Sequence, residues 1–466
     1  MRAVVCVRQG LDGEINPFDA CAYEAALRLE GAEVILLSMG AMGAGELLHG
    51  LTRLGAKKAI LLSDKRFAGA DTLATAYTLS RAIKKLSPDL VFCGRQTLVG
   101  DTAQTGAMLS VLAELPLITN VMSIDRLTDG KIFCTTRSEG EAQADIPALI
   151  TVERINTLRL PRLRSRLGEL EVWNAEDIGA DIERCGLAGS PTRVVKTFEN
   201  TSGKRKCQFI TQDRLRWAIS EGLKKNRETV SVAKTDSEKL SSICIVGDAP
   251  REFAKTVSDS VTVIPLTDAQ SIAQRIKELD PPAVLWGSDT RSKRLAATVS
   301  AMLGLGLCAD CTSLECEGGE LMMYRPALSG SIIAKIRSLT RPAMATVRTD
   351  SEAVRDVIVT AGFGAKGKMD DVRSFADSIK AELCATRRLV DNGYAQYGMQ
   401  VGLTGKTVSP PVYVTVGVSG AVHHIVGMQR SGTVIAVDPD KNAPIFDYAD
   451  YGIVEEFDLE KINKNT

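Results

Sequence analysis

The sequence predicts an α/β fold made of three doubly wound, mainly parallel-sheet units. Two observations carry this prediction. Short apolar runs of strand length alternate with amphipathic helical stretches in three separate parts of the chain. The strand runs are also almost continuously apolar, which is typical of parallel strands covered by helices on both faces. A length of 466 residues accommodates two to four domains of ordinary size.

The first unit is predicted to cover residues 1–198. Apolar runs of four to six residues predict its strands, and apolar stripes at helical spacing predict the helices between them. The expected strands are Ala3–Val7, Glu33–Ser38, Ala59–Leu62, Leu90–Cys93 and Ala148–Val152, and the expected helices are Ala22–Leu29, Leu73–Leu86 and Thr105–Ala113. The residues from Pro161 to Phe198 are predicted to form a tail of this unit.

Residues 199–240 form a polar segment, predicted to be a connector with one helix at Gln212–Leu223. A second, smaller unit is expected at residues 241–350, with strands Ser242–Val246, Val261–Pro265 and Ala283–Trp286, a helix at Lys293–Met302 and a closing segment Arg325–Val347. A third unit is expected at residues 351–466, with strand Asp356–Thr360, helix Asp370–Leu383, strand Val412–Val416, a helix from Ser419, strand Val434–Val437, and then the segments Ile445–Phe446 and Tyr451–Val454.

Charge and composition exclude several classes of protein. The chain has 57 Lys+Arg and 57 Asp+Glu, so its zero net charge gives no reason to expect nucleic acid or an anionic membrane as partner. Without an apolar run near the roughly 20 residues of a spanning helix, we expect no integral membrane segment and a soluble, cytoplasmic protein. The 11 cysteines are expected to be free thiols. Cys308, Cys311 and Cys316 lack a second ligand pair nearby, so no metal site is predicted.

The most specific local pattern lies in the third unit, where strand Val412–Val416 leads into Gly417–His424. Gly417 and Gly420 flank Ser419, which we expect to cap the following helix. A glycine-rich turn between a strand and a helix favours a phosphate or pyrophosphate ligand. A hydrolase with a nucleophilic Ser419 is disfavoured, because Ala421 replaces the last glycine of the G-x-S-x-G pattern.

Two other loops are weaker candidates. Val401–Pro410 contains two glycines and a Gly-Lys-Thr sequence, but the spacing does not fit a phosphate loop of the Walker type, and on its own it predicts a solvated turn. Cys93–Gly106 follows a strand of the first unit, a position that suits an adenine nucleotide. There Thr102, Gln104 and Thr105 could contact phosphate oxygens, and an ordinary capped loop–helix junction is the alternative.

Ordered motifs along most of the chain resemble those of electron transfer flavoproteins, with a β-subunit-like half followed by an α-subunit-like half. The β-like motifs are Ile15–Asp19, Phe67–Tyr77, Gly100–Gln104 and Gly186–Thr192, and the α-like motifs are Cys308–Thr312, Ala345–Arg348, Ala385–Arg387, Val401–Lys406, Gly417–His424 and Ala443–Ile453. The resemblance implies an adenine-nucleotide-hydrolase-like first domain, a shortened second α/β domain and a C-terminal Rossmann-like FAD-binding domain.

The resemblance also implies cofactors and their contacts. FAD is expected in the C-terminal domain, at Thr386, Arg387, Val401, Gly402, Leu403, Thr404, Ser419, Gly420, Ala421, Val422, His423, His424, Asp438, Glu456 and Phe457. AMP or a second FAD is expected in the β-like half, at Cys6, Asn16, Met39, Thr97, Asp101, Thr102, Gln104 and Thr105. The Gly100–Gln104 and Gly186–Thr192 strings favour the second FAD, as in members that bifurcate electrons from NADH.

The implied roles are electrostatic, and no catalytic residue is expected because the chemistry belongs to the flavin. Arg387 near the isoalloxazine would raise its reduction potential by favouring negatively charged reduced forms. His424 near the flavin N1–C2 carbonyl would act alike, by hydrogen bond if neutral and more strongly if protonated. The chain departs from the family pattern at Phe363, which replaces an arginine that Lys366 or Lys368 would have to compensate, at Leu403, which replaces a glutamine, and at Asp438, where an asparagine is typical.

Three functions remain open at this point. The first is an FAD-based electron carrier that takes electrons from an acyl-CoA dehydrogenase-like enzyme, as in fatty acid β-oxidation, or from another flavin dehydrogenase, and passes them to a quinone oxidoreductase or ferredoxin. The second is a bifurcating flavoenzyme with two FAD that oxidises NADH itself. The third is a nucleotide-binding or regulatory protein whose flavin site has decayed, which Phe363, Leu403 and Asp438 motivate.

Overall fold

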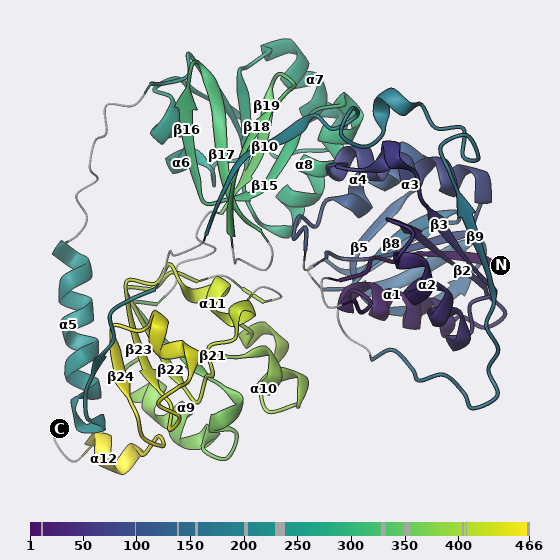
Figure 1. Ribbon diagram of the computed structural model, residues 1–466. Coiled ribbons are helices and arrows are strands. Elements are labelled where there is room, and N and C mark those ends of the chain that lie inside the picture. The colour runs from purple at the N-terminus through teal and green to yellow at the C-terminus, as the bar shows by residue number, and fades with distance from the viewer. Residues whose placement is uncertain are drawn as a thin grey trace. The chain divides into compact units, whose positions relative to one another are not determined.

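The computed structural model describes residues 1–10, 13–97, 99–137, 139–153, 157–199, 204–228, 238–327, 332–348, 355–402, 405–406 and 408–463. The chain folds as two compact units (Figure 1). The first unit comprises Met1–Thr197, Ser237–Leu328 and Ala334–Thr349, and the second comprises Phe198–Asp236, Ser329–Ile333 and Asp350–Thr466. The α/β class predicted from the sequence is confirmed, since the sheets are mostly parallel and carry helices on their faces.

The first unit contains a nine-stranded sheet in the order β7-β6-β5-β8-β4-β1-β2-β3-β9. Its parallel centre matches the five predicted strands and consists of β1 (Arg2–Cys6), β2 (Glu33–Met39), β3 (Lys58–Leu62), β4 (Leu90–Gly94) and β8 (Ala148–Val152). The helices between them are α1 (Pro17–Leu27), α2 (Ala44–Leu51), α3 (Thr72–Leu86) and α4 (Thr105–Ala113). Buried aliphatic side chains on both faces of this sheet form two cores.

Four strands of this sheet lie outside the sequence prediction. They are β5 (Leu117–Thr128), β6 (Lys131–Thr136), β7 (Gly140–Asp145) and β9 (Glu169–Trp173). The pairs β5–β6 and β6–β7 are antiparallel, and buried residues alternate with more exposed ones along β6. Because one face of such strands is polar, they lack the continuous apolar run used for prediction. Strand β9 pairs with β3, so part of the predicted tail belongs to the sheet.

The second α/β domain, also in the first unit, contains two sheets. The parallel one has the order β13-β12-β14-β19-β15, from β12 (Ile243–Val246), β13 (Val261–Ile264), β14 (Ala283–Trp286), β15 (Leu307–Cys311) and β19 (Ala343–Val347), with helices α6 (Arg251–Val257), α7 (Ala269–Leu279) and α8 (Thr290–Leu303). The other has the order β10-β18-β17-β16, from β10 (Thr192–Glu199), β16 (Ser313–Glu317), β17 (Glu320–Ala327) and β18 (Ile332–Ser338). Strand β10 comes from the predicted tail and joins a sheet of this domain.

The second unit is built on a six-stranded sheet in the order β11-β24-β23-β22-β20-β21, in which all five pairings are parallel. The strands are β11 (Gln208–Phe209), β20 (Val357–Ala361), β21 (Glu382–Ala385), β22 (Val412–Val416), β23 (Thr433–Val437) and β24 (Tyr451–Ile453), and the helices are α5 (Leu215–Glu228), α9 (Met369–Ser378), α10 (Arg387–Asp391), α11 (Val422–Met428) and α12 (Leu459–Asn463). This is the Rossmann-like arrangement expected for the C-terminal domain.

Two local expectations for this unit are wrong. The helix expected at Asp370–Leu383 ends at Ser378, and the apolar residues after it form the edge strand β21. The helix expected from Ser419 begins at Val422, with Ala421 as its N-cap and no capping side chain. For the Ile445–Phe446 segment no element type was predicted, and it lies in a 3-10 helix, Pro444–Tyr448.

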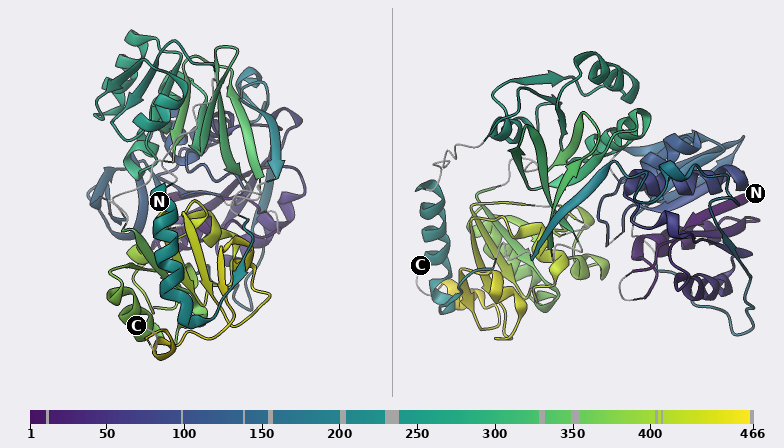
Figure 2. Two further views of the ribbon diagram at one scale, coloured as in Figure 1. Left: turned by 90° about the vertical axis from the view of Figure 1, so that its left-hand side faces the viewer. Right: turned by 45° about the horizontal axis from the view of Figure 1, so that its top comes forward.

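The segment expected to be a connector also packs on this sheet. Strand β11 pairs with β24, and α5 lies along β22 and β23 (Figure 2). Leu215, Ala218 and Ile219 of α5 enter the core of the domain. The sequence analysis did not predict this packing, because residues 199–240 are polar overall and only one face of α5 is apolar.

Candidate nucleotide-binding sites

In the second unit, the residues expected to contact FAD follow the carboxyl ends of parallel strands of one sheet. Thr386 and Arg387 follow β21, the Gly417–His424 segment follows β22, Asp438 follows β23, and Glu456 with Phe457 comes after β24. Parallel strands end at a common sheet edge, which is where open α/β sheets bind their ligands. The Val401 amide donates to the Ala385 carbonyl oxygen at 3.0 Å, which brings Val401 and Gly402 to the same edge. Leu403 and Thr404 lie outside the described residues.

The glycines of the Gly417–His424 segment allow two stretches of backbone to pass very close to each other. Gly417 has φ +65°, and a Cβ there would lie 2.5 Å from the Ala365 nitrogen. Gly420 has φ +89°, and a Cβ there would lie 2.2 Å from the Ile445 nitrogen. The turn therefore needs glycine for its own packing. It leaves Ser419, Ala421, Val422 and His423 exposed at the sheet edge.

Arg387 is the first residue of α10, and its side chain is 26% exposed. Its Nε lies 3.1 Å from the Asp391 carboxylate one helical turn away, which leaves part of the guanidinium available to a ligand. Arg388 instead lies over the ring of Phe363, with 4.2 Å between its guanidinium carbon and the ring centroid. Lys366 also lies over that ring, at 4.8 Å. Phe363 stands at the arginine position of the family pattern. It carries no charge itself, but the cationic groups of Arg388 and Lys366 pack over its ring.

His424 is 6% exposed and held by protein groups at both ring nitrogens. Nδ1 faces the Val401 carbonyl oxygen at 3.2 Å, and Nε2 faces the Tyr413 hydroxyl at 3.3 Å. Thr360 Oγ1 donates to the same hydroxyl at 2.6 Å. Burial lowers the pKa of His424 to about 4. A neutral imidazole with its proton on Nδ1 satisfies all of these contacts.

The remaining expected contacts differ in environment. Asp438 is buried, its carboxylate accepts from the Asp440 amide at 3.0 Å, and burial raises its pKa. Phe457 packs edge-on against Phe375 in the core, with ring centroids 5.7 Å apart. Lys368 donates to the Phe457 carbonyl oxygen at 2.7 Å and pairs with Glu456 at 3.2 Å, so its charge is partly taken up by the chain.

The described residues at this edge fit FAD by the chemistry that they offer. The hydroxyls of Thr386 and Ser419 and the guanidinium of Arg387 suit the polar and phosphate parts of a dinucleotide. The exposed side chain of Val422, 47% accessible, suits an apolar ring. These groups follow β21 and β22, the two strands that flank β20, at the carboxyl edge where such sheets bind their ligands.

A second set of expected residues lies at the carboxyl edge of the N-terminal sheet. Cys6 ends β1, Met39 ends β2, and the 95–104 loop follows β4. Asn16 precedes α1, and its side-chain amide donates to the Gln96 carbonyl oxygen at 3.0 Å. The other predicted residues of this site belong to that loop or to the start of α4 and are Thr97, Asp101, Thr102, Gln104 and Thr105.

The 95–104 loop contains an unsatisfied buried donor. Gln104 is 2% exposed, and its Oε1 accepts from Thr72 Oγ1 at 3.1 Å, whereas its Nε2 has no hydrogen-bond partner among the described residues. The neighbouring Asp101 accepts from Gln96 Nε2 at 2.9 Å, and burial raises its pKa to about 6. A buried amide donor without an acceptor is costly, so Gln104 points to a ligand oxygen in this loop.

A charged cluster that the sequence analysis missed lies beside this loop. Glu153 follows β8, is 0% exposed, and has one carboxylate oxygen 3.5 Å from both Arg95 Nε and Arg137 Nη1. Within the part of the chain that the structure describes, neither oxygen of Glu153 accepts a hydrogen bond, and Nε and Nη2 of Arg95 donate none. Charged residues directly after two buried strands were the available signal, since strand ends are where ligands bind in this fold.

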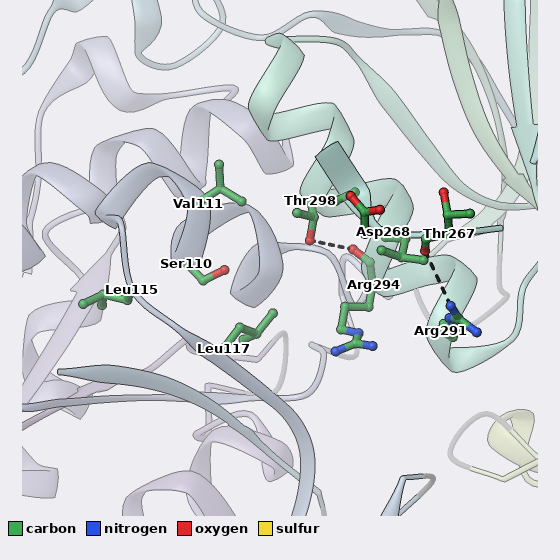
Figure 3. A pocket seen from close by; sticks show the side chains of 11 residues that line it. Ser110, Val111, Leu115, Leu117, Thr267, Asp268, Arg291, Arg294 and Thr298 are labelled. Carbon is green, nitrogen blue, oxygen red and sulfur yellow. Dashed lines mark hydrogen bonds between the residues drawn. The ribbon is translucent and has the colours of Figure 1, made fainter. Parts of the chain in front are cut away.

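A pocket of about 500 Å³ opens between α4 and α8 of the first unit (Figure 3). Val111, Leu115 and Leu117 line one side, and Arg291 and Arg294 come from α8. None of the residues expected to contact a nucleotide lines it. Cys308 and Cys311 are buried in β15 of the same domain, and the described residues contain no group of side chains suited to hold a metal ion.

The surface of the first unit carries an exposed leucine–arginine segment. Leu160, Leu163 and Leu167 are 87%, 102% and 52% exposed, and Arg162, Arg164 and Arg166 alternate with them. Fully exposed leucines cost free energy in water and often mark interaction sites. None of the described helices combines the length and the apolar composition needed to cross a membrane.

Parallel α/β sheets with polar loops at their carboxyl edges are typical of nucleotide-binding proteins. Comparison with known protein families identifies the family of this chain. The electron transfer flavoprotein domain matches residues 3–178 and 256–369, and the electron transfer flavoprotein FAD-binding domain matches residues 353–429. The chain belongs to the electron transfer flavoprotein family.

Curated relatives resemble the two kinds of subunit in this family. Protein FixA of Azorhizobium caulinodans is 39% identical over 224 residues, which are 44% of this chain and 79% of that protein. Subunit CarD of the caffeyl-CoA reductase-Etf complex of Acetobacterium woodii is 39% identical over 207 residues, 41% of this chain and 78% of that protein. The electron transfer flavoprotein α subunit of Thermoanaerobacterium thermosaccharolyticum is 33% identical over 232 residues, 40% of this chain and 70% of that protein. The chain thus joins a β-like and an α-like sequence.

Proposed function

We propose that this electron transfer flavoprotein binds its FAD at the carboxyl edge of the β20–β24 sheet and exchanges electrons there with partner proteins. The observation that carries this proposal is the position of Arg387, which is partly exposed at the carboxyl end of β21, within the stretch that the FAD-binding domain matches. Bound FAD supplies the redox chemistry, and the protein has to hold it and set its potential.

Each proposed contact has a defined task. Arg387 places positive charge beside the flavin, which stabilises negative charge on it. The exposed Ser419–His423 loop and Thr386 hold the dinucleotide through backbone and hydroxyl groups. Hydrogen bonds with Val401 and Tyr413 keep the His424 ring neutral. The positive charge beside the flavin is therefore supplied by Arg387. Phe363 offers a ring face where the family pattern has an arginine, so Arg388 and Lys366 are the nearby cations.

For the N-terminal site we propose a second FAD, with AMP as the alternative. Support comes from the buried cluster of Arg95, Arg137 and Glu153 beyond β4 and β8. AMP fills an adenosine pocket and a phosphate loop and needs no further polar groups. A flavin, in contrast, has a polar edge with both donors and acceptors, which would satisfy the unpaired donors of Arg95 and the Glu153 carboxylate.

A second FAD would make the chain a direct oxidant of NADH, as in the bifurcating alternative. We propose as partners a flavin dehydrogenase, of the acyl-CoA dehydrogenase type or another, and an acceptor such as a quinone oxidoreductase or a ferredoxin. Leu160 and Leu163 are proposed to enter an apolar pocket of the dehydrogenase, with acidic residues around it facing the adjacent arginines. We propose a cytoplasmic location, since all 11 cysteines are free thiols, as reducing compartments favour.

Cofactor analysis of the purified full chain tests these proposals. The protein is denatured, and released FAD and AMP are separated and counted per chain. Two FAD are expected. One FAD with one AMP would replace the second FAD by AMP and leave the carrier function intact, whereas no FAD would favour a decayed flavin site. Anaerobic addition of NADH without any partner then decides direct hydride uptake, which is expected to bleach part of the flavin absorbance.

A further inference from the structure

Arg325 reaches from the second α/β domain to the nucleotide loop of the first. It lies in β17 and is 6% exposed. Its Nη2 donates to the Gly100 carbonyl oxygen at 2.9 Å and to the Asp101 carbonyl oxygen at 3.0 Å. The two domains belong to one compact unit, so this contact is part of its packing.

The loop that Arg325 holds has a strained backbone. Asp101 and Ala103 have φ values of +50° and +53°, in the left-handed region that non-glycine residues rarely adopt. Such conformations persist only where surrounding contacts impose them, and they cluster at ligand sites. Gln104 follows in the right-handed region, with φ −104° and ψ −31°, directly before the nine-residue helix α4. A left-handed residue followed by a right-handed one turns successive amides toward a common point, an arrangement that binds anions.

The two Arg325 hydrogen bonds fix the direction of the neighbouring amides. In a trans peptide the C=O and N–H groups point to opposite sides. When the carbonyls of Gly100 and Asp101 face Arg325, the amides of Asp101 and Thr102 face away from it. The Asp101 amide is used within the loop, where it donates to the Thr97 carbonyl oxygen at 2.8 Å. The Thr102 amide is thereby directed away from the Arg325 side of the loop.

An independent observation places a ligand at this loop. Nε2 of Gln104 is buried and has no acceptor among the residues that the structure describes, and the residue is only 2% exposed. Two other charges near the loop pair with each other, since Lys293 Nζ lies 2.8 Å from the Asp310 carboxylate. An anionic oxygen accepting from Gln104 would complete the site.

We propose that Arg325 is a positioning residue for the nucleotide phosphate in the N-terminal half. It holds the Gly100 and Asp101 carbonyls so that the loop keeps its anion-binding form, and the site is complete only when the second α/β domain is docked. This inference rests on the proposed function, in that the N-terminal site takes an adenine nucleotide.

Binding of AMP and of adenosine to the nucleotide-stripped full chain tests the proposal. Calorimetry compares wild type with Arg325→Gln, which removes the charge, and with Arg325→Lys, which keeps the charge but ends one bond short of the Nη2 position. Arg325→Gln should weaken AMP binding tenfold to a hundredfold and leave adenosine binding within twofold. Arg325→Lys should fall between. Amide hydrogen exchange should quicken in residues 99–105 of both variants.

Arg294→Gln is the matched control. Arg294 also bridges the two domains, with its Nη2 2.9 Å from Glu139 Oε1, but it lies at the pocket between α4 and α8 and does not contact the nucleotide loop (Figure 3). Its AMP and adenosine affinities should match those of wild type.

Three results would overturn the inference. The first is unchanged AMP binding in both Arg325 variants. The second is an equal loss of AMP and adenosine affinity, which would show that Arg325 acts only on the fold. The third is a wild type that does not prefer AMP over adenosine, since the phosphate would then not bind at this loop. If wild type binds no AMP, ADP or FAD in this half, the proposed N-terminal site itself is wrong. The measurement on wild type alone separates this outcome from a failure of the role proposed for Arg325.

Discussion

The Tyr413 hydroxyl lies 3.3 Å from Nε2 of His424, deep in the C-terminal domain. Thr360 donates to this hydroxyl, and the Val401 carbonyl oxygen lies 3.2 Å from Nδ1 of the same ring. The hydroxyl therefore donates to Nε2, and the ring proton sits on Nδ1. This chain of hydrogen bonds holds His424 neutral and fixes its orientation at the edge where FAD is proposed to bind.

The depressed pKa of His424 predicts a loss of stability in acid. In the unfolded chain a histidine takes up a proton near pH 6.5, whereas the folded protein resists protonation down to its pKa of about 4. The unfolded state binds more protons between these values, so stability is lost as pH falls from about 6.5 to 4. At pH 5 the loss amounts to about 2 kcal/mol relative to neutral pH.

Urea unfolding of wild type and His424→Gln at pH 7.5 and pH 5 measures the contribution of His424 to the loss of stability in acid. Contributions of other titrating groups cancel in the comparison of the two proteins. We expect wild type to lose about 2 kcal/mol more than the variant between the two pH values. Equal losses would show that His424 titrates normally in the folded protein.

Replacement of Arg387 by Ala is expected to lower the flavin reduction potential and to leave FAD bound. Loss of a charge-assisted contact worth roughly 1.5–3 kcal/mol corresponds to about 30–60 mV for two electrons. Potentiometric titration of the holoprotein gives the shift. Arg388→Ala is the control, because Arg388 lies over Phe363, and its potential should stay near that of wild type. An unaltered potential in Arg387→Ala would remove Arg387 from this role.

Replacement of Asp438 by Asn is expected to stabilise the protein and tighten FAD binding near neutral pH. Burial raises the pKa of Asp438, so the folded protein favours its protonated form, and stability falls as pH rises through that pKa. The amide carries no charge to desolvate or to repel a phosphate. We expect FAD affinity to rise three- to tenfold, about 0.7–1.4 kcal/mol. Asp440→Asn, at an exposed position, should have a smaller effect. Weaker FAD binding in Asp438→Asn would contradict this account.

Replacement of Leu163 by Glu is expected to slow electron uptake from the dehydrogenase without changing the fold. The side chain is fully exposed, so its loss costs no core packing, whereas an added carboxylate opposes insertion into an apolar pocket. Stopped-flow reduction by the partner should slow at least tenfold, and the melting temperature should stay within 1–2 °C. Leu187→Glu, exposed elsewhere on the unit, serves as control. Unchanged reduction rates would place the docking surface elsewhere.

The sequence predicts the parallel cores of this protein well, because buried parallel strands such as Leu90–Gly94 and Val412–Val416 are continuous apolar runs. It misses β5 to β7, whose polar faces interrupt the apolar pattern, and it merges β21 with the preceding helix because Ala381 and Cys384 continue the apolar composition. In those places the local pattern is ambiguous, and tertiary packing decides the outcome.

The candidate sites also contain some residues that the sequence predicts and some contacts that it does not. Residues that follow predicted strands, such as Ser419 and Gln104, can be placed on a sheet edge from the sequence alone, whereas Arg387 follows the unpredicted β21 and was assigned through the family resemblance. The contact of Arg325 with Gly100 cannot, because it joins residues 225 positions apart in different domains. The partners of His424 are equally hidden, since Tyr413 lies on a strand whose side chains appear from the sequence to be core only.

Titration of FAD into the deflavinated full chain, followed by anaerobic reduction, tests the central claim most directly. The account predicts saturable uptake of FAD, with visible absorbance bands that vanish on reduction and return when an oxidised acceptor is added. A chain that stays colourless in excess FAD would contradict it.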